Sequence, residues 1–518
     1  MRSVLRGAAV VALASVALTF HQTVVGRAQQ GCASVQPAAG WMCVNGGWLP
    51  PDNPLAGGAP VPPSGAPGRP ATPPASCPTI QPAPGWMCVN GGWLPPDNPL
   101  VPRGPSTAPA SCPTVRPASD WVCVNGGWLP PGFPLLNPGP VQPSTSHQLL
   151  LVDSAHAALV RDSLRRGEPQ FQPALSALVT DANRALTLAP LSVMDKRVTP
   201  PSGDKHDYMS QAPYWWPNPS KPGGKPYIRR DGRRNPEIDR ITDHQNLAVL
   251  GRAVTTLTLG FYFTDGQQYA QHAARLLEVW FLDPATRMNP NLLFAQGIPG
   301  IADGRAAGII ESRWLADIVG AVSILESSPA WSVSDDAALK DWMRAYLTWL
   351  LESKLGRAEA TRGNNQETWY EVQVVALAIF TSQTDVARTT LERARGAIGR
   401  EFEPDGRQPR ELERTRAWDY SIFDLTAFVE LAELGKLAGV DLWNYQTADG
   451  RSIRKGIEFL IPFATRARRF PYPQITEFQP SALGPILRAA ATALNEPGYL
   501  DIAREIGGGA RRLDLTLP

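Results

Sequence analysis

The sequence predicts a mainly α-helical domain that follows small β-hairpins stapled by disulfides. Apolar residues recur at helical spacing in about a dozen segments after residue 147, and few segments there alternate as strands do. All six cysteines lie between Cys32 and Cys123, in three pairs of identical spacing. Helices of similar length favour antiparallel helical hairpins packed in a ring or an arc. Periodicity alone does not separate a toroid from a solenoid.

Residues 1–28 are typical of an export signal. Arg2 and Arg6 precede an apolar run at residues 7–20, and Gly26 and Ala28 supply small residues at the spacing of a cleavage site. The run is short for a membrane span. We therefore expect a secreted or periplasmic protein with no membrane span after signal cleavage. A retained N-terminal anchor is the alternative.

Residues 29–135 hold three Cys/Trp repeats joined by linkers rich in proline. Each repeat has an Asn-Gly turn between short alternating segments, which predicts a tight hairpin. Pairing within each unit is the simplest disulfide framework, and zinc binding without accompanying histidines is the weaker alternative. The expected pairs are Cys32–Cys43, Cys77–Cys88 and Cys112–Cys123. The repeats fit either carbohydrate- or wall-binding modules that gain avidity from three copies, or spacers whose tryptophans cover the disulfide.

Residues 147–518 form the predicted helical domain. In residues 243–264, for example, the apolar stripe consists of Leu247, Leu250, Val254, Leu257 and Phe261. The predicted helices span residues 149–166, 172–189, 243–264, 267–282, 306–327, 335–355, 364–381, 387–401, 419–437, 452–465, 479–495 and 497–506.

An irregular stretch at residues 199–239 interrupts these helices. It is rich in proline and glycine, and it carries many basic residues beside Tyr208, Tyr214, Trp215 and Trp216. A long loop in a compact helical domain is usually functional or disordered, and so many aromatic residues argue against disorder. Aromatic faces stack on sugar rings, and guanidinium groups attract an acidic chain. We predict that the four named residues bind substrate; a flap that packs them inward is the alternative.

Two short segments, at residues 363–370 and 409–420, carry the chemistry. The amides of Asn364 and Asn365 and the guanidinium of Arg414 could hold a sugar carboxylate and stabilise the enolate that forms beside it. If nearby guanidinium groups lowered its pKa, the Tyr420 phenol could remove the C5 proton of a 4-linked uronate and then protonate the leaving oxygen. No metal or organic cofactor is needed. Each residue also has a structural interpretation, as a helix cap, a surface ion pair or a core tyrosine.

The chain from about residue 192 to residue 463 resembles the alginate lyase superfamily of helical-toroid polysaccharide lyases. The matching motifs lie at residues 208–219, 281–292, 364–370 and 404–420. The resemblance implies an incomplete (α/α) toroid with a central groove, and β-elimination on alginate, polyglucuronate or a related uronan. It does not cover the cysteine repeats.

The resemblance also implies roles for single residues. Asn364 and Asn365 match the pair that helps to neutralise the substrate carboxylate, Arg414 matches the motif arginine, and Tyr420 matches the tyrosine that serves as acid and, for one C5 stereochemistry, as base. The family usually has histidine after the asparagine pair, where this chain has Gln366. A syn elimination with Tyr420 in both roles is compatible with that change.

The remaining predictions concern binding and the competing functions. His206 or His244 could supply the missing imidazole from elsewhere in the fold. The further predicted substrate-binding residues are His244, Trp369, Tyr370, Arg416 and Trp418. The net charge of +2 gives no case for nucleic acid. From the motifs and the resemblance, the expected partner is an anionic polysaccharide, bound by a monomer.

Two other functions remain open. A glycoside hydrolase on a similar helical ring would need two carboxylates, for which Glu367, Glu371, Asp419 and Asp424 are available. A non-catalytic uronan-binding protein is the second alternative.

Overall fold

The computed structural model describes residues 154–507 and 515–516, together with three pairs of short strands nearer the N-terminus. These antiparallel pairs are β1 (Met42–Val44) with β2 (Gly47–Leu49), β3 (Met87–Val89) with β4 (Gly92–Leu94), and β5 (Val122–Val124) with β6 (Gly127–Leu129). They lie where the sequence predicts hairpins. The predicted export signal and the cysteine side chains lie outside the described residues, so the disulfides stay a prediction.

The described part of the main domain is built mostly from helices. The α-helices are α2 (Ser154–Arg165), α3 (Gln172–Ala185), α4 (Asp243–Thr264), α5 (Gln267–Leu277), α6 (Trp314–Leu325), α7 (Val333–Glu352), α8 (Lys354–Glu359), α9 (Asn365–Phe380), α10 (Thr384–Glu401), α11 (Pro409–Leu412), α12 (Ala417–Ala438), α13 (Ile453–Ala464), α14 (Gly484–Ala493) and α15 (Gly498–Glu505). Short 3-10 helices are η2 (Pro169–Phe171), η3 (Val193–Asp195), η4 (Pro222–Gly224), η5 (Pro236–Arg240), η7 (Ala306–Arg313) and η8 (Pro480–Leu483), and η6 (Glu278–Leu282) is a π-helical turn.

Helix α4 shows how the apolar pattern builds the core. Leu247, Leu250, Val254 and Leu257 are fully buried, and each contributes on the order of 2 kcal/mol by leaving water. The helix ends at Asp265, whose left-handed backbone (φ 57°) lets its N–H donate to the Phe261 carbonyl. Among the described helices, α4 alone is long and apolar enough to cross a membrane by length and composition. Two thirds of that window (67%) is buried among its neighbours, as in a core helix.

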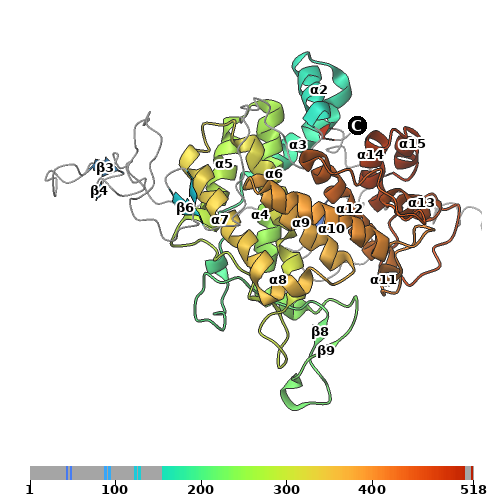
Figure 1. Cartoon of the computed structure of the whole chain (residues 1–518), viewed down its shortest axis with the longest axis horizontal. Coiled ribbons are helices and arrows are strands. Elements are labelled where there is room, and N and C mark those ends of the chain that lie inside the picture. The colour runs from blue at the N-terminus through green and yellow to red at the C-terminus, as the bar shows by residue number, and fades with distance from the viewer. Residues whose placement is uncertain are drawn as a thin grey trace, which may run out of the picture. The chain divides into compact units, whose positions relative to one another are not determined.

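Successive helices pack as hairpins, which confirms the predicted fold class. Helix α4 contacts α3, α5 and α6, and α9 packs between α10 and α12, beside which it runs in Figure 1. Such helical hairpins form the incomplete (α/α) toroid that the sequence predicts. Nearly every predicted helix is found within a few residues of its expected bounds.

The structure departs from the predicted helices at places where tertiary contacts intervene. The predicted helix at residues 306–327 begins as the 3-10 helix η7, because its backbone presses against β10 (Phe294–Gly297). A side chain at Gly308 would meet the Ala295 carbonyl oxygen at 2.6 Å. Helices α8 and α11 are short additions in segments expected to be irregular.

The irregular stretch at residues 199–239 is ordered by short strands. Strand β7 (Met209–Gln211) pairs in parallel with β10, and β8 (Trp215–Trp216) pairs antiparallel with β9 (Ile228–Arg229). In Figure 1, β8 and β9 belong to a loop that projects beyond the ends of the helices. This loop brings its residues to the helix ends that carry the two chemical motifs.

Candidate active site

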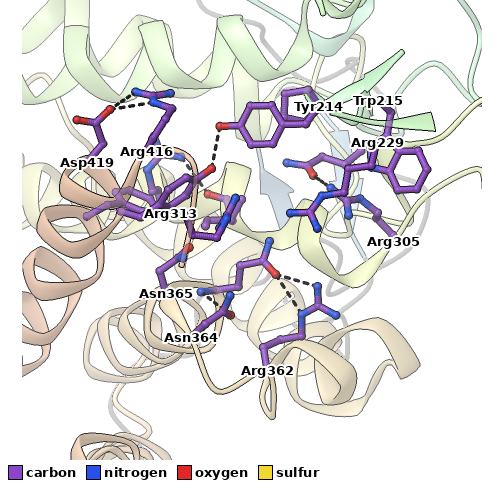
Figure 2. Close-up of a pocket in the computed structure, with 17 residues that line it drawn as sticks. Tyr214, Trp215, Arg229, Arg305, Arg313, Arg362, Asn364, Asn365, Arg416 and Asp419 are labelled. Carbon is purple, nitrogen blue, oxygen red and sulfur yellow. Dashed lines mark hydrogen bonds and ion pairs between the residues drawn. The ribbon is translucent and has the colours of Figure 1, made fainter. Parts of the chain in front are cut away.

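A cavity of about 790 Å³ lies where the projecting loop meets the N-terminal ends of α9 and α12. Its lining contains six arginines and one carboxylate, Asp419, so its potential is strongly positive. Figure 2 shows these side chains gathered around one space. The lining residues are Pro213, Tyr214, Trp215, Arg229, Gln296, Arg305, Ile310, Arg313, Arg362, Asn364, Asn365, Gln366, Arg414, Arg416, Asp419, Tyr420 and Phe423.

The paired amides sit at the N-terminal end of α9. Gly363 takes a left-handed conformation (φ 68°), and Asn364 then caps the helix, its side-chain oxygen accepting from the Gln366 N–H at 3.4 Å. Asn364 thus caps α9 and also lines the cavity, where the sequence predicts it to bind substrate. Asn365 is almost fully buried, and its backbone N–H and its amide both donate to Glu411, at 3.0 and 2.8 Å. The buried Glu411 carboxylate therefore orients one of the two amides.

Gln366 occupies the position where the family usually has histidine. Its side-chain carbonyl accepts hydrogen bonds from the Arg362 guanidinium at 2.9 and 3.1 Å, as the dashed lines of Figure 2 show. Because Gln366 lines the cavity and its oxygen is bound to Arg362, its amide N–H groups are its side-chain donors for a ligand. The pair of Gln366 and Arg362 is therefore a source of donors and positive charge, and it contains no base for neutral pH.

Arg414 is held in place by Asp231 from the projecting loop. Two guanidinium nitrogens donate to the two carboxylate oxygens at 2.8 and 3.1 Å, a bidentate pair. Thr415 donates to the same carboxylate from its hydroxyl at 3.2 Å. Burial would raise the pKa of Asp231, but hydrogen bonds from Arg414 hold it below its usual value. Asp231 lies 183 residues before Arg414 in the sequence and acts as a charged clamp that fixes the direction of its guanidinium group.

Tyr420 lies between Arg414 and Tyr214. The Arg414 guanidinium carbon stands 3.7 Å from the centre of the Tyr420 ring, and the Tyr420 hydroxyl donates to the Tyr214 hydroxyl at 2.8 Å. Burial raises the pKa of Tyr420, Tyr214 raises it further, and Arg414 opposes them. The condition set by the sequence analysis, a Tyr420 pKa below its ordinary value, is therefore not met in this arrangement. Arg414 acts in the predicted direction, but burial outweighs it.

Arg416 is held by the carboxylate of Asp419, which is itself tied to a neighbouring segment. The Arg416 Nε donates to Asp419 at 2.8 Å. Asp419 also accepts from the Gln474 amide at 2.9 Å and from the Thr476 hydroxyl at 2.7 Å. The one carboxylate in the cavity wall is thus occupied by partners that fix its direction.

Two further arginines, Arg305 and Arg313, enter the cavity from η7 and the loop before it. Arg305 donates to the Gln296 side chain, and its buried Nε has no hydrogen-bond partner in the described part of the chain. Burial lowers the pKa of Arg305 to about 10. Arg313 lies 5.5 Å from the Phe423 ring centre, and burial lowers its pKa as well. Such partly dehydrated cations gain strongly from an incoming anion.

Several residues predicted to bind substrate lie elsewhere. Tyr208, Tyr370 and Trp418 are buried in the core, where Tyr208 donates to Glu311, Tyr370 to the Leu350 carbonyl and Trp418 to the Gln479 carbonyl. These assignments are corrected, because each polar tip has an interior partner. Trp369 is also buried and stacks at 5.0 Å on Phe423, so it supports the cavity wall without forming it.

The other unconfirmed candidates belong to the loop and to α4. Trp216 donates to the Arg233 carbonyl and lies under the Arg230 guanidinium at 5.4 Å. His244 is bound through Nδ1 to the Ile241 carbonyl, and His206 to the Arg287 carbonyl. None of these three lines the cavity, so neither histidine replaces the family imidazole there.

The sequence motifs bring together Asn364, Asn365, Gln366, Arg414 and Tyr420, and with them Tyr214, Trp215 and Arg416. Sequence reasoning missed the arginines contributed from other segments and the clamp that holds Arg414. The missed residues are Arg305, Arg313, Arg362, Gln296 and Asp231. Only Asp231 had a visible signal in the sequence, because it is the single acid in the run of basic residues at 229–234.

No group of three or more His, Cys, Asp or Glu side chains in the described residues has the geometry of a metal site. The cavity offers donors and cations for an anion, and a phenol for proton transfer.

Comparisons with known proteins identify the family of this chain. The model of the family described as alginate lyase matches residues 192–470, more than half of the chain. An alginate lyase from Bacteroides ovatus of known structure is 38% identical, with a TM-score of 0.68 over 70% of this chain and 97% of that chain. Alginate lyase A1-III from Sphingomonas species A1 is 15% identical, with a TM-score of 0.48 over 72% of this chain and 97% of that one. A comparison with curated proteins gave no match.

Proposed function

Because this chain belongs to the alginate lyase family and is a polysaccharide lyase, we propose that it cleaves a 4-linked uronic-acid polymer, alginate or glucuronan, by β-elimination. One observation carries the proposal. The amide pair, Gln366, Arg414 and Tyr420 line a single cavity whose wall holds six arginines against one paired carboxylate. A uronan presents one carboxylate per sugar, which is the charge this cavity attracts.

The first task of the site is to hold the substrate carboxylate. Asn364, the second amide hydrogen of Asn365 and Arg414 supply neutral and charged donors in the cavity wall. Removing the C5 proton places a second negative charge on the carboxylate as the enolate forms. Donors held by Glu411 and Asp231 need no reorganisation at that moment, and this is how they stabilise the transition state.

The second task is proton transfer by Tyr420. Its phenolate oxygen takes the C5 proton, the C–H electrons form the double bond between C4 and C5, and the C4–O bond breaks. The phenol then returns its proton to the leaving oxygen, and Tyr420 ends the cycle as the phenolate with which it began. Because burial raises the pKa of Tyr420, forming the phenolate is costly, and we expect the rate to rise with pH through neutrality. The hydrogen bond to Tyr214 offers the phenolic proton a path away from the sugar.

The hydrolase alternative lacks support in the cavity. It needs two carboxyl groups across the scissile bond. Of the four acids available in the sequence, Glu367, Glu371 and Asp424 are buried outside the cavity, and Asp419 is paired with Arg416. This distribution favours a lyase over a hydrolase. The export signal supports the further proposal that the enzyme acts in the periplasm or outside the cell.

The test is a panel of mannuronan, guluronan, glucuronan and glycosaminoglycans, assayed for the ultraviolet absorbance of unsaturated products. We expect product from at least one uronan and none from Tyr420→Phe, whose circular dichroism and uronan affinity should match those of the wild type. Substantial turnover by Tyr420→Phe would refute the dual-role tyrosine. Binding of every uronan without product from the wild type would instead indicate a non-catalytic binding protein.

A further inference from the structure

We propose that a second basic hollow, built by residues 463–478, binds an acidic polysaccharide chain outside the catalytic cavity. The hollow has a volume of about 530 Å³ and adjoins the C-terminal end of α13. It would hold a remote stretch of the same uronan, so the inference rests on the substrate proposed above. Its lining residues are Phe463, Arg466, Arg468, Arg469, Phe470, Tyr472, Gln474, Thr476 and Phe478.

Three exposed arginines supply the charge of this hollow. Within the described residues, Arg466, Arg468 and Arg469 make no ion pair with any carboxylate, and Arg468 stands 5.7 Å from the Phe463 ring centre. The adjoining hollow of about 440 Å³ shares Arg468 but differs in charge, because its own cations, Lys455 and Arg407, are paired with acids. Three unpaired guanidinium groups in one hollow leave a local positive charge for an external anion.

An aromatic layer forms the base beneath these arginines. The Phe470 ring lies 5.2 Å from Tyr472 and 5.6 Å from Phe478, and Phe478 lies 4.5 Å from the buried Trp418. Trp418 anchors the layer to α12, so the rings have little freedom to move. Rigid aromatic faces beside guanidinium groups suit the C–H faces and the carboxylates of a uronan chain.

The hollow is joined to the catalytic cavity by hydrogen bonds. Gln474 lines the hollow, and its amide donates to Asp419, which pairs with Arg416 in the cavity wall. The backbones also pair, because the Ile475 N–H donates to the Thr415 carbonyl at 3.0 Å. A long polymer engaged at both places would gain affinity through the high effective concentration of its second segment.

The test compares long and short substrates with the full-length protein. In R466A/R468A/R469A we expect the KM for long uronan to rise about tenfold, as the loss of three exposed charge contacts implies, with kcat retained. The KM for a tetrasaccharide bound in the catalytic cavity alone should stay unchanged. Arg→Lys at the three positions should restore most of the polymer affinity. R197A/R388A, which removes two exposed arginines elsewhere, is a control for the loss of surface charge and should behave as the wild type.

Equal KM values for long uronan in the wild type and the triple alanine variant would overturn the proposal. So would an equal loss on the tetrasaccharide, which would place the damage in the catalytic cavity. Tighter competition by DNA than by uronan at the hollow would overturn it as well. Direct binding of long uronan, measured without turnover, separates this inference from the proposed function. If the wild type forms no product but the triple variant binds long uronan more weakly, the binding role of the hollow is supported and the lyase activity is refuted.

Discussion

The two sides of the N-terminal turn of α9 carry opposite kinds of ionisable group. The side that faces the cavity is ringed by arginines, which retain donors for an anion after pairing with Asp231 or Gln366. The interior side holds carboxyl groups that burial keeps from water. Burial raises the pKa of Glu411, Glu401 and Asp424 alike.

The contrast shows how one short segment can be both attractive to anions and stable. A carboxylate in the cavity would cancel the charge that attracts the substrate, so most nearby acids are turned inward. There they act as hydrogen-bond acceptors for the groups that form the site, as Glu411 does for Asn365. Buried acids that are not fully paired reduce stability when they ionise. We therefore expect substitutions on the cavity side to change catalysis, and substitutions of the interior acids to change how stability depends on pH.

The largest effect after the loss of Tyr420 should come from Asp231→Ala. Without its bidentate partner the Arg414 guanidinium loses its direction, and the positioned donor is worth on the order of a hundredfold in kcat/KM. We expect the loss mainly in kcat, measured as product formation on the preferred uronan. Asp239→Asn is the control, because Asp239 pairs with Arg234 outside the cavity lining. Equal losses in both variants would contradict the role of Asp231 as a clamp.

We expect the buried carboxyl group of Glu359 to make the free energy of unfolding depend on pH. Among the described residues, both of its buried carboxylate oxygens lack a hydrogen-bond partner, although Arg362 forms an ion pair with it at 3.5 Å. Burial outweighs that pair and raises the pKa of Glu359 to about 7 from 4.5. The folded protein therefore holds a proton that the unfolded chain releases, and the free energy of unfolding should fall as the pH rises from 4.5 to about 7. The expected loss is on the order of 3 kcal/mol, measured by denaturant unfolding.

Glu359→Gln should reduce this slope and raise stability above pH 7; part of the slope should remain, because burial also raises the pKa of Glu371 to about 7. The control is Glu278→Gln, which changes an exposed partner of Arg275 and should leave the slope in place. An unchanged slope in Glu359→Gln would show that Glu359 is ionised throughout this range.

The smallest effect should come from Gln366→His. A neutral imidazole can accept from Arg362 as the glutamine does, so we expect kcat/KM at alkaline pH to stay within about threefold of the wild type or to rise. The variant should add an inflection to the pH–rate profile near the pKa of histidine, which is about 6.5. A collapse of activity would show that the amide N–H of Gln366 has a role that imidazole cannot fill.

Local sequence features predicted a large part of this protein. Helical periodicity located the helices because burial of an apolar stripe is decided within one segment, as in α4. Gly363 and Asn364 marked the start of α9 because capping involves only neighbouring residues. The two motifs therefore placed the amides, Arg414 and Tyr420 at helix ends, where such side chains can converge.

Only the tertiary structure decided which of the candidates reach the cavity and what holds them. Tyr208, Tyr370 and Trp418 have the composition of a sugar-binding surface, but long-range packing turns them into the core. The pair of Asp231 and Arg414 joins loop and helix across 183 residues, and the burial that raises the pKa of Tyr420 depends on the same approach. Periodicity reports which face of a segment is apolar, and it does not report which distant segment covers that face.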